Sequence, residues 1–330
     1  MASSRLNTAL GPDGLILPAT GKIALFEPPA DTDLSDLPLD RCQVIQSFRS
    51  DADALAARGF DCVTAPDGLY AAAIVFLPRV RELSQAQIAA ACAAAPDGPV
   101  LVDGQKTDGV DSMLRHIRAR VPVDGHISKA HGKAFWFASS PAFADWTSAG
   151  ITTNAAGYLT APGVFSADDI DPASALLAAT LPARLGSGVA DLGAGWGYLS
   201  AQILSRPEVT TLHVVEADHT ALTCARANVT DPRAHFYWED ATRWLSRELV
   251  DSVVMNPPFH VSRKADPGLG QAFIAAAARA MKPSGSLWMV ANRHLPYESA
   301  LSSIFAQVTE VGGDSRFKIL HAQRPARTRR

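Results

Sequence analysis

Short apolar runs alternate along the chain with longer stretches in which apolar residues recur at helical spacing. Runs such as "GVADLG" and "LHVVEAD" have the length and β-branched content of strands. Segments such as "ALTCARANV" and "GQAFIAAAARAM" repeat apolar residues every three or four positions, as amphipathic helices do. This pattern predicts an α/β fold in which a mostly parallel sheet carries helices on both faces.

The first half of the chain has the same rhythm as the second, which indicates an internal repeat. Residues 71–104 and 251–292 each contain an apolar strand that ends near a proline, an Ala-rich helix, a Pro-x-Gly turn and another apolar strand. In this alignment "NPPF" at 256–259 corresponds to "LPRV" at 77–80. Small residues, Gly and Pro gather at 149–163. We therefore expect two tandem domains, 1–155 and 156–330, although any two α/β domains share part of this rhythm.

Composition narrows the class of protein without defining its activity. The 330 residues suffice for two domains, and 47% of them are apolar. No apolar run is long enough to cross a bilayer, and the first residues do not follow the pattern of a signal peptide. The four cysteines are far apart and form no CxxC pair, which argues against a zinc site and a disulfide framework. We expect a cytoplasmic protein that uses no metal and no membrane.

Charge is nearly balanced overall but not locally. The net charge is −3, so the chain as a whole is no polycation. From Arg316 to Arg330 there are six Lys and Arg residues and no acidic residue. This tail could add contacts to the phosphates of a nucleic acid, or it could be a solvated chain end. The sequence leaves both readings open.

A glycine-rich turn marks the expected cofactor site. In "VADLGAGWGYLS" a strand runs through Asp191 into Gly193, Gly195 and Gly197, and a helix follows. Dinucleotide-binding turns share such glycines, but they commonly space them G-x-G-x-x-G and must cradle a pyrophosphate. Asp191 would repel a pyrophosphate, whereas it suits a cationic amino-acid group. The α-ammonium and sulfonium groups of S-adenosyl-L-methionine meet that description.

Further acids follow at the ends of the next two strands. Glu216 ends the strand in "LHVVEAD", 25 residues after Asp191, where a carboxylate can accept hydrogen bonds from both ribose hydroxyls. Asp240 and Ala241 follow a third strand in "FYWEDATRW", where a carboxylate could accept a hydrogen bond from an adenine amino group. Acids at three successive strand ends, in this order, predict an adenosyl ligand.

The fourth strand of this half ends in the tetrapeptide "NPPF", within "DSVVMNPPFH". Proline has no backbone N–H, so the two prolines cannot continue a sheet ladder. Ligands of open α/β sheets lie beyond the carboxyl ends of the strands, so the motif points toward the methyl donor. The Asn256 side-chain oxygen and the Pro257 carbonyl can accept hydrogen bonds from a planar NH2 group, and Phe259 can stack on a base. The motif therefore predicts methyl transfer to a planar amino nitrogen.

Together these motifs resemble those of the class I S-adenosylmethionine-dependent methyltransferases, and more closely those of the RsmC/RlmG group of ribosomal RNA guanine-N2 methyltransferases. The segments that carry the resemblance are "GVFSADDIDPASALLAATL", "DLGAGWGYLS", "MNPPFH", "VANRHLPYESAL" with "FKI", and "FLPRVREL" with "GPVLVDGQKTDGV". The resemblance implies two tandem Rossmann-like methyltransferase domains, of which the first is degenerate and aids folding and RNA binding. The residues that it assigns to S-adenosyl-L-methionine are Asp191, Gly193, Gly195, Gly197, Glu216, Asp240 and Ala241, and those that it assigns to the target base are Asn256, Pro257 and Phe259.

The expected function is transfer of a methyl group to the N2 amino group of a guanine in ribosomal RNA, with the small subunit favoured. Because Asn-Pro-Pro-aromatic motifs serve planar NH2 groups in general, adenine N6 and a protein glutamine remain alternative targets. A non-catalytic RNA-binding assembly factor is the alternative from another class. The sequence does not specify the target nucleotide, whether free RNA or an assembled subunit is the substrate, or the oligomeric state.

Overall fold

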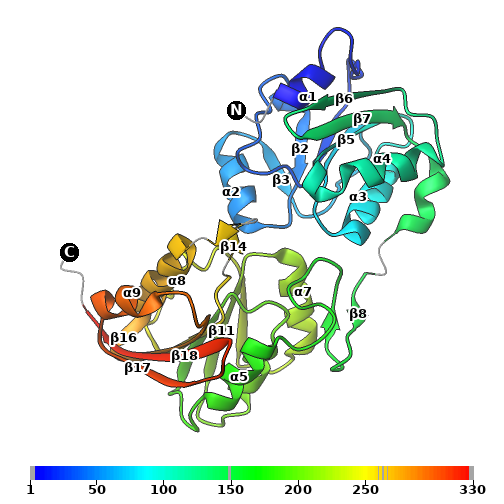
Figure 1. Cartoon of the computed structure of the whole chain (residues 1–330). Coiled ribbons are helices and arrows are strands. Elements are labelled where there is room, and N and C mark those ends of the chain that lie inside the picture. The colour runs from blue at the N-terminus through cyan, green and yellow to red at the C-terminus, as the bar shows by residue number, and fades with distance from the viewer. Residues whose placement is uncertain (1–3, 148–149, 259, 262–263, 266, 327–330) are drawn as a thin grey trace. The chain divides into compact units, whose positions relative to one another are not determined.

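The structure, a computed structural model, describes residues 4–147, 150–258, 260–261, 264–265 and 267–326 (Figure 1). The chain divides into two compact units, 1–150 and 151–330, whereas the sequence placed the division between 155 and 156. Each unit contains a seven-stranded sheet with helices packed against it. The predicted α/β fold with two tandem Rossmann-like domains is therefore confirmed.

The first unit has the strand order β3-β2-β1-β4-β5-β7-β6. The strands from β3 to β5 are parallel, and β7 and β6 form an antiparallel pair at one edge. The strands are β1 (Ile23–Phe26), β2 (Cys42–Ile45), β3 (Asp61–Val63), β4 (Ala72–Phe76), β5 (Pro99–Gln105), β6 (Gly125–Lys129) and β7 (Gly132–Ala138). The helices are α1 (Ser4–Ala9), α2 (Arg49–Ala57), α3 (Arg81–Ala94) and α4 (Val110–Arg118).

The second unit has the strand order β12-β11-β10-β13-β16-β18-β17, with β18 and β17 antiparallel. Its strands are β10 (Gly188–Leu192), β11 (Thr211–Glu216), β12 (Ala234–Trp238), β13 (Val250–Met255), β16 (Met281–Asn292), β17 (Phe305–Gly313) and β18 (Phe317–Pro325). Its helices are α5 (Pro172–Thr180), α6 (Tyr198–Leu204), α7 (His219–Asn228), α8 (Pro267–Ala280) and α9 (Tyr297–Ile304). Two small hairpins pair β8 (Thr152–Thr153) with β9 (Leu159–Thr160), and β14 (His260–Val261) with β15 (Lys264–Ala265).

Successive side chains of the central strands point to opposite faces of the second sheet, and both faces are covered by helices. Ala190 and Leu192 of β10 belong to the apolar cluster that includes residues of α8 and α9, which lie together in Figure 1. Val189 belongs to the cluster that includes residues of α5, α6 and α7. A parallel sheet buried on both faces requires nearly continuous apolar strands. Asp191 interrupts that pattern and is nevertheless fully buried, which singles it out for a purpose other than packing.

The shared strand order allows individual positions in the two units to be compared. After β10, Gly193 donates its backbone N–H to the carbonyl of Val215 at 2.9 Å. After β1, Glu27 donates in the same way to Ile45 at 2.8 Å. The φ angles of Gly193 and Glu27 are 74° and 52°. A left-handed backbone costs a residue with a Cβ roughly 1–2 kcal/mol, a cost that glycine avoids. The first unit thus has the same turn without the glycine.

The register of the strands also identifies what stands in the first unit where the second has its polar site residues. Leu25 occupies the position of Asp191, and Phe76 occupies the position of Asn256. The alignment based on sequence had matched Asn256 to Leu77, one residue further along, because it followed the prolines and not the hydrogen bonds. Both replacements are apolar, so the first unit lacks the acid and the amide of the predicted site. None of the helices in the described ranges is long and apolar enough to span a membrane.

Candidate active site

The predicted site lies where the chain reverses direction in the second sheet. From β10 the chain proceeds outward to β11 and β12, and then crosses back to β13 on the other side of β10. Ligands of open α/β sheets bind at such a switch point, beyond the carboxyl ends of the strands. The glycine turn after β10 and Asn256 after β13 therefore lie on either side of the expected ligand.

The glycine turn between β10 and α6 depends on its glycines for two different reasons. Gly193, Gly195 and Gly197 all have positive φ angles, of 74°, 57° and 93°. A Cβ built on Gly195 would meet no described atom within 4 Å, so this glycine borders open space. A Cβ on Gly197 would lie 3.1 Å from Val229 Cγ2 and 3.3 Å from the Ala225 Cα. Gly197 thus allows the start of α6 to pack closely against α7, while Gly195 faces the site.

Two buried carboxylates support this turn. Asp191 Oδ2 accepts a hydrogen bond of 2.7 Å from the Ser200 hydroxyl. Glu216 Oε2 accepts one of 2.8 Å from the backbone N–H of Gly195, and its Oε1 accepts one of 2.8 Å from the backbone N–H of Asp218. Burial raises the pKa of Asp191 to about 7 and the pKa of Glu216 to about 7. Desolvation penalises the charged form of each acid, so this pair favours a cationic ligand.

The surroundings of Asp191 fit the cationic end of S-adenosyl-L-methionine. No described residue donates a hydrogen bond to Asp191 Oδ1, although this atom is buried. A buried carboxylate oxygen without a donor is costly, and an ammonium group would supply the donor. The open space beside Gly195 gives such a group room to approach the backbone. Asp191, Gly195 and Glu216 therefore form a set that suits this cofactor.

Trp196, in the middle of the turn, anchors a second segment of the chain. Its ring is buried against Tyr158 and Tyr198, at centroid distances of 4.8 and 5.9 Å. Its indole N–H donates to the carbonyls of Phe165 and Ser166, at 3.1 and 3.3 Å. Ser166 itself has a φ of 51°, a strained conformation for a residue with a side chain. The glycine turn and the segment 165–166 are thus held together through one side chain.

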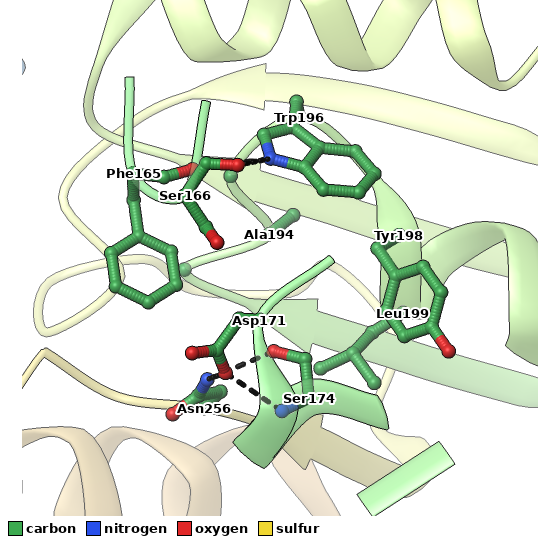
Figure 2. A pocket seen from close by; sticks show the side chains of 11 residues that line it. Phe165, Ser166, Asp171, Ser174, Ala194, Trp196, Tyr198, Leu199 and Asn256 are labelled. Atoms are coloured by element: carbon green, nitrogen blue, oxygen red, sulfur yellow. Dashed lines mark hydrogen bonds between the residues drawn. The ribbon is translucent and has the colours of Figure 1, made fainter. Parts of the chain in front are cut away.

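These elements border one pocket, shown from close by in Figure 2. Its lining comes from the glycine turn, the start of α6, the segment 165–166, the start of α5 and the end of β13: Phe165, Ser166, Asp171, Ser174, Gly193, Ala194, Gly195, Trp196, Tyr198, Leu199 and Asn256. The cavity volume is about 40 Å³. Ligand sites commonly have about 300–1,000 Å³. A ligand of cofactor size therefore requires the pocket to widen.

Asn256 meets the start of α5 at this pocket. Its side-chain Nδ2 donates to Asp171 Oδ2 at 3.0 Å and to Ser174 Oγ at 2.9 Å. Figure 2 shows the amide nitrogen directed toward these two residues. Asp171 and Ser174 are not among the site residues that the sequence predicts. The pattern Asp-Pro-x-Ser was a visible signal, but it is typical of the N-cap of any helix, so it did not indicate a role at the site.

Of the predicted residues, Gly193, Gly195 and Asn256 line the pocket, whereas Asp191, Gly197 and Glu216 do not, and the others lie outside it or outside the described residues. Asp240 accepts hydrogen bonds from the backbone N–H and the hydroxyl of Thr242, at 2.8 and 2.7 Å, and Ala241 is buried in the apolar core. Pro257 is buried next to Asn256. Phe259 lies outside the described residues. The adenine role of Asp240 and Ala241 and the base-binding role of Pro257 and Phe259 stay predictions, and no metal-binding group of three or more His, Cys, Asp and Glu side chains occurs among the residues described.

The fold and the site together define a class I methyltransferase that depends on S-adenosyl-L-methionine. This cofactor carries an electrophilic methyl group, and the roles of the individual site residues toward it stay predictions. The family model of the methyltransferase small domain matches residues 156–321. The chain belongs to this family.

Two relatives and one solved structure refine the comparison. The chain is 27% identical over 327 residues to ribosomal RNA small subunit methyltransferase C of Hahella chejuensis. The matched region covers 92% of this chain and 95% of the relative. It is 32% identical over 165 residues to ribosomal RNA large subunit methyltransferase G of Aeromonas hydrophila, covering 48% and 43%. The structure of the T. thermophilus 16S rRNA N2 G1207 methyltransferase (RsmC), in complex with AdoMet and guanosine, has a TM-score of 0.78 and 26% identity, covering 93% of this chain and 89% of that chain. The resemblance to the RsmC/RlmG group is thereby confirmed.

Proposed function

We propose that this protein transfers the methyl group of S-adenosyl-L-methionine to the exocyclic N2 amino group of a guanine in ribosomal RNA of the small subunit. The observation that carries the proposal is that Asn256 and the glycine turn border the same pocket. The acceptor amide and the expected cofactor site thus lie together at the switch point of the sheet. The small subunit follows from the relative that matches almost the whole chain.

The chain's part in the reaction is to hold the two reactants in line. Asp191 would accept a hydrogen bond from the α-ammonium group of the cofactor, and Glu216 would accept hydrogen bonds from its ribose. Asn256 Oδ1 would accept a hydrogen bond from the guanine amino group, which would draw the nitrogen toward a pyramidal shape. When bound, the cofactor would supply the methyl group and leave as S-adenosylhomocysteine. The methylated nitrogen would then lose its acidic proton to water, so no strong base is needed.

The same geometry would serve adenine N6 or a glutamine amide. The similarity to a 16S rRNA N2 G1207 methyltransferase solved with guanosine favours guanine. We assign the first domain to folding and RNA binding, as the resemblance to the RsmC/RlmG group implies. Leu25 and Phe76 stand where the second domain has Asp191 and Asn256, so the first domain lacks these two site residues. Ribosomal RNA as a substrate also suggests that the protein acts in the cytoplasm.

Methyl transfer to ribosomal subunits tests the proposal. Small and large subunits from cells that lack this protein are incubated with it and labelled S-adenosyl-L-methionine, and their nucleosides are analysed by mass spectrometry. We expect N2-methylguanosine in the small subunit. N6-methyladenosine, or label only in ribosomal protein, would replace guanine by one of the alternative targets. Cofactor binding with no label in either subunit would contradict ribosomal RNA as the substrate.

A further inference from the structure

The amide of Asn256 is held by residues that lie more than eighty positions earlier in the chain. Its Nδ2 donates to Asp171 Oδ2 at 3.0 Å and to Ser174 Oγ at 2.9 Å. A primary amide has two N–H donors, so both are used by these two contacts. The polar atom that the amide can offer to a substrate amino group is therefore Oδ1, an acceptor.

Asp171 is the partner that determines which way the amide faces. An amide that rotates by half a turn exchanges Oδ1 and Nδ2 with little change in shape. The Ser174 hydroxyl tolerates either orientation, because it can accept or donate a hydrogen bond. A carboxylate only accepts, so rotation would bring Asn256 Oδ1 against Asp171 without a proton between them. Repulsion from Asp171 thus excludes the reversed amide.

The Asp171 carboxylate is itself fixed in place. It forms the N-cap of α5, where Oδ2 also accepts the backbone N–H of Ser174 at 2.8 Å. Ser174 is buried, and its hydroxyl is the second partner of the amide. The start of α5 is therefore a rigid support, and not a mobile side chain that happens to reach Asn256.

We propose that Asp171 is a positioning residue for methyl transfer, which keeps Asn256 Oδ1 turned toward the acceptor amino group and its Nδ2 turned away. This inference rests on the proposed function, because it assigns Asn256 the role of accepting a hydrogen bond from the substrate NH2. It adds that the reaction depends on the N-cap of α5. A charge-assisted hydrogen bond to the amide nitrogen also makes Oδ1 a stronger acceptor.

The substitution Asp171→Asn separates this role from the structural one. Asparagine is as good an N-cap as aspartate, so α5 and the melting temperature are retained. In Asp171→Asn the side-chain oxygen can keep the cap, while the NH2 group takes the place of the second carboxylate oxygen and can donate to a reversed Asn256 amide, so the orientation is no longer fixed. We expect kcat to fall by about 10- to 100-fold, as for a reacting group that is misplaced. The dissociation constant for S-adenosyl-L-methionine should stay within about twofold of the wild-type value if Asp171 acts on Asn256 only. Asp169→Asn, in the same segment but exposed, is the matched control and should behave as wild type.

A double-mutant cycle shows whether Asp171 acts through Asn256. In an Asn256→Ala background, Asp171→Asn should lower kcat no further, because there is no amide left to orient. If the two substitutions together lowered kcat by the product of their separate effects, the inference would be overturned. An increase in the cofactor dissociation constant with kcat unchanged would do the same, since Asp171 would then contact the cofactor.

The orientation can also be observed without any substrate. In ¹⁵N-labelled protein, the side-chain NH2 signals of Asn256 are identified by their loss in Asn256→Ala. We expect Asp171→Asn to shift these signals and Asp169→Asn to leave them in place. Unchanged signals in Asp171→Asn would refute the positioning role. If the wild-type protein methylated no guanine, the proposed function would fail, while the NH2 signals would still show whether Asp171 orients the amide.

Discussion

Gln46 and Glu216 occupy the same position in the two domains, directly after the paired residues Ile45 and Val215, and each accepts a hydrogen bond from a backbone N–H two residues further on. The second polar atom of each side chain makes a different kind of hydrogen bond. Glu216 accepts from the Gly195 N–H, whereas Gln46 donates to the carbonyl of Pro28 at 3.1 Å. The first domain has therefore kept the local turn and replaced the charge that a ribose would need.

This difference predicts that one molecule of S-adenosyl-L-methionine binds per chain. Isothermal titration calorimetry of the full chain measures the stoichiometry directly. Asp191→Ala should remove all measurable binding while the protein stays folded, because the ammonium group loses its buried acceptor. Residual binding of one equivalent in this variant would mean that the first domain has a cofactor site of its own.

Asn256→Ala should separate chemistry from cofactor binding. Asn256 contacts α5 and is proposed to face the acceptor, so its loss should raise the barrier to methyl transfer by about 2–4 kcal/mol, as for removal of one positioned polar group. Single-turnover kinetics measures this change, and calorimetry should find the cofactor affinity retained. Equal losses of affinity and rate would show that Asn256 supports the pocket and does not position the acceptor.

The buried acids predict that cofactor binding depends on pH. Folding raises the pKa of Asp191 from 3.8 and that of Glu216 from 4.5, each to about 7. The folded chain therefore retains protons that the unfolded chain releases, and these groups make its unfolding free energy fall as the pH rises from about 4 through 7. A cationic ligand favours the ionised acids, so binding should release protons at pH 7 and tighten between pH 6 and 8.

Calorimetry in buffers of different ionisation enthalpy counts these protons. Glu216→Gln is the informative variant, since it removes one of the two acids and should reduce the number released. An affinity that does not change with pH, with no proton release in the wild-type protein, would contradict the assignment of both acids to the cofactor.

Two glycines of the same turn should respond differently to alanine. Gly197→Ala forces a Cβ against Val229 and Ala225 at a φ of 93°, so we expect a loss of about 2–3 kcal/mol in the free energy of unfolding. Gly195→Ala meets open space at a φ of 57° and should cost about 1–2 kcal/mol. Its Cβ enters the pocket, however, so the cofactor affinity should fall more than in Gly197→Ala. Urea unfolding measures the stability of both variants, and calorimetry measures their cofactor affinity. A larger loss of affinity in Gly197→Ala than in Gly195→Ala would contradict the prediction.

Much of the fold and part of the site could be predicted because strand ends are marked in the sequence. A buried parallel strand is an apolar run, so an acid within it or at its end, as at Asp191 and Glu216, stands out. The strand order then brings residues from separate strand ends to one edge of the sheet. Strand order alone therefore predicts that the glycine turn and Asn256 lie together, as they do at the pocket.

The contacts that the sequence could not reveal depend on packing between distant segments. Asp171 and Asn256 are far apart in the chain, and Asp171 has the ordinary pattern of a helix N-cap. The packing role of Gly197 depends on how closely α7 approaches, which no local pattern encodes. The match of Asn256 to Phe76 required the register of hydrogen bonds, because the sequence alone does not show whether Pro78 corresponds to Pro257 or to Pro258.

The tandem order of the two sheets has an effect during protein synthesis. In the described part of the chain the sheets exchange no strand, and the first is complete at Ala138. The last strand of the second sheet ends at Pro325. At a synthesis rate of about 5–20 residues per second, the ribosome finishes the first sheet roughly 10–40 s before the second. Mixed α/β domains that fold in two states commonly need no more than about seconds, so the first domain has time to fold while the second is still being synthesised.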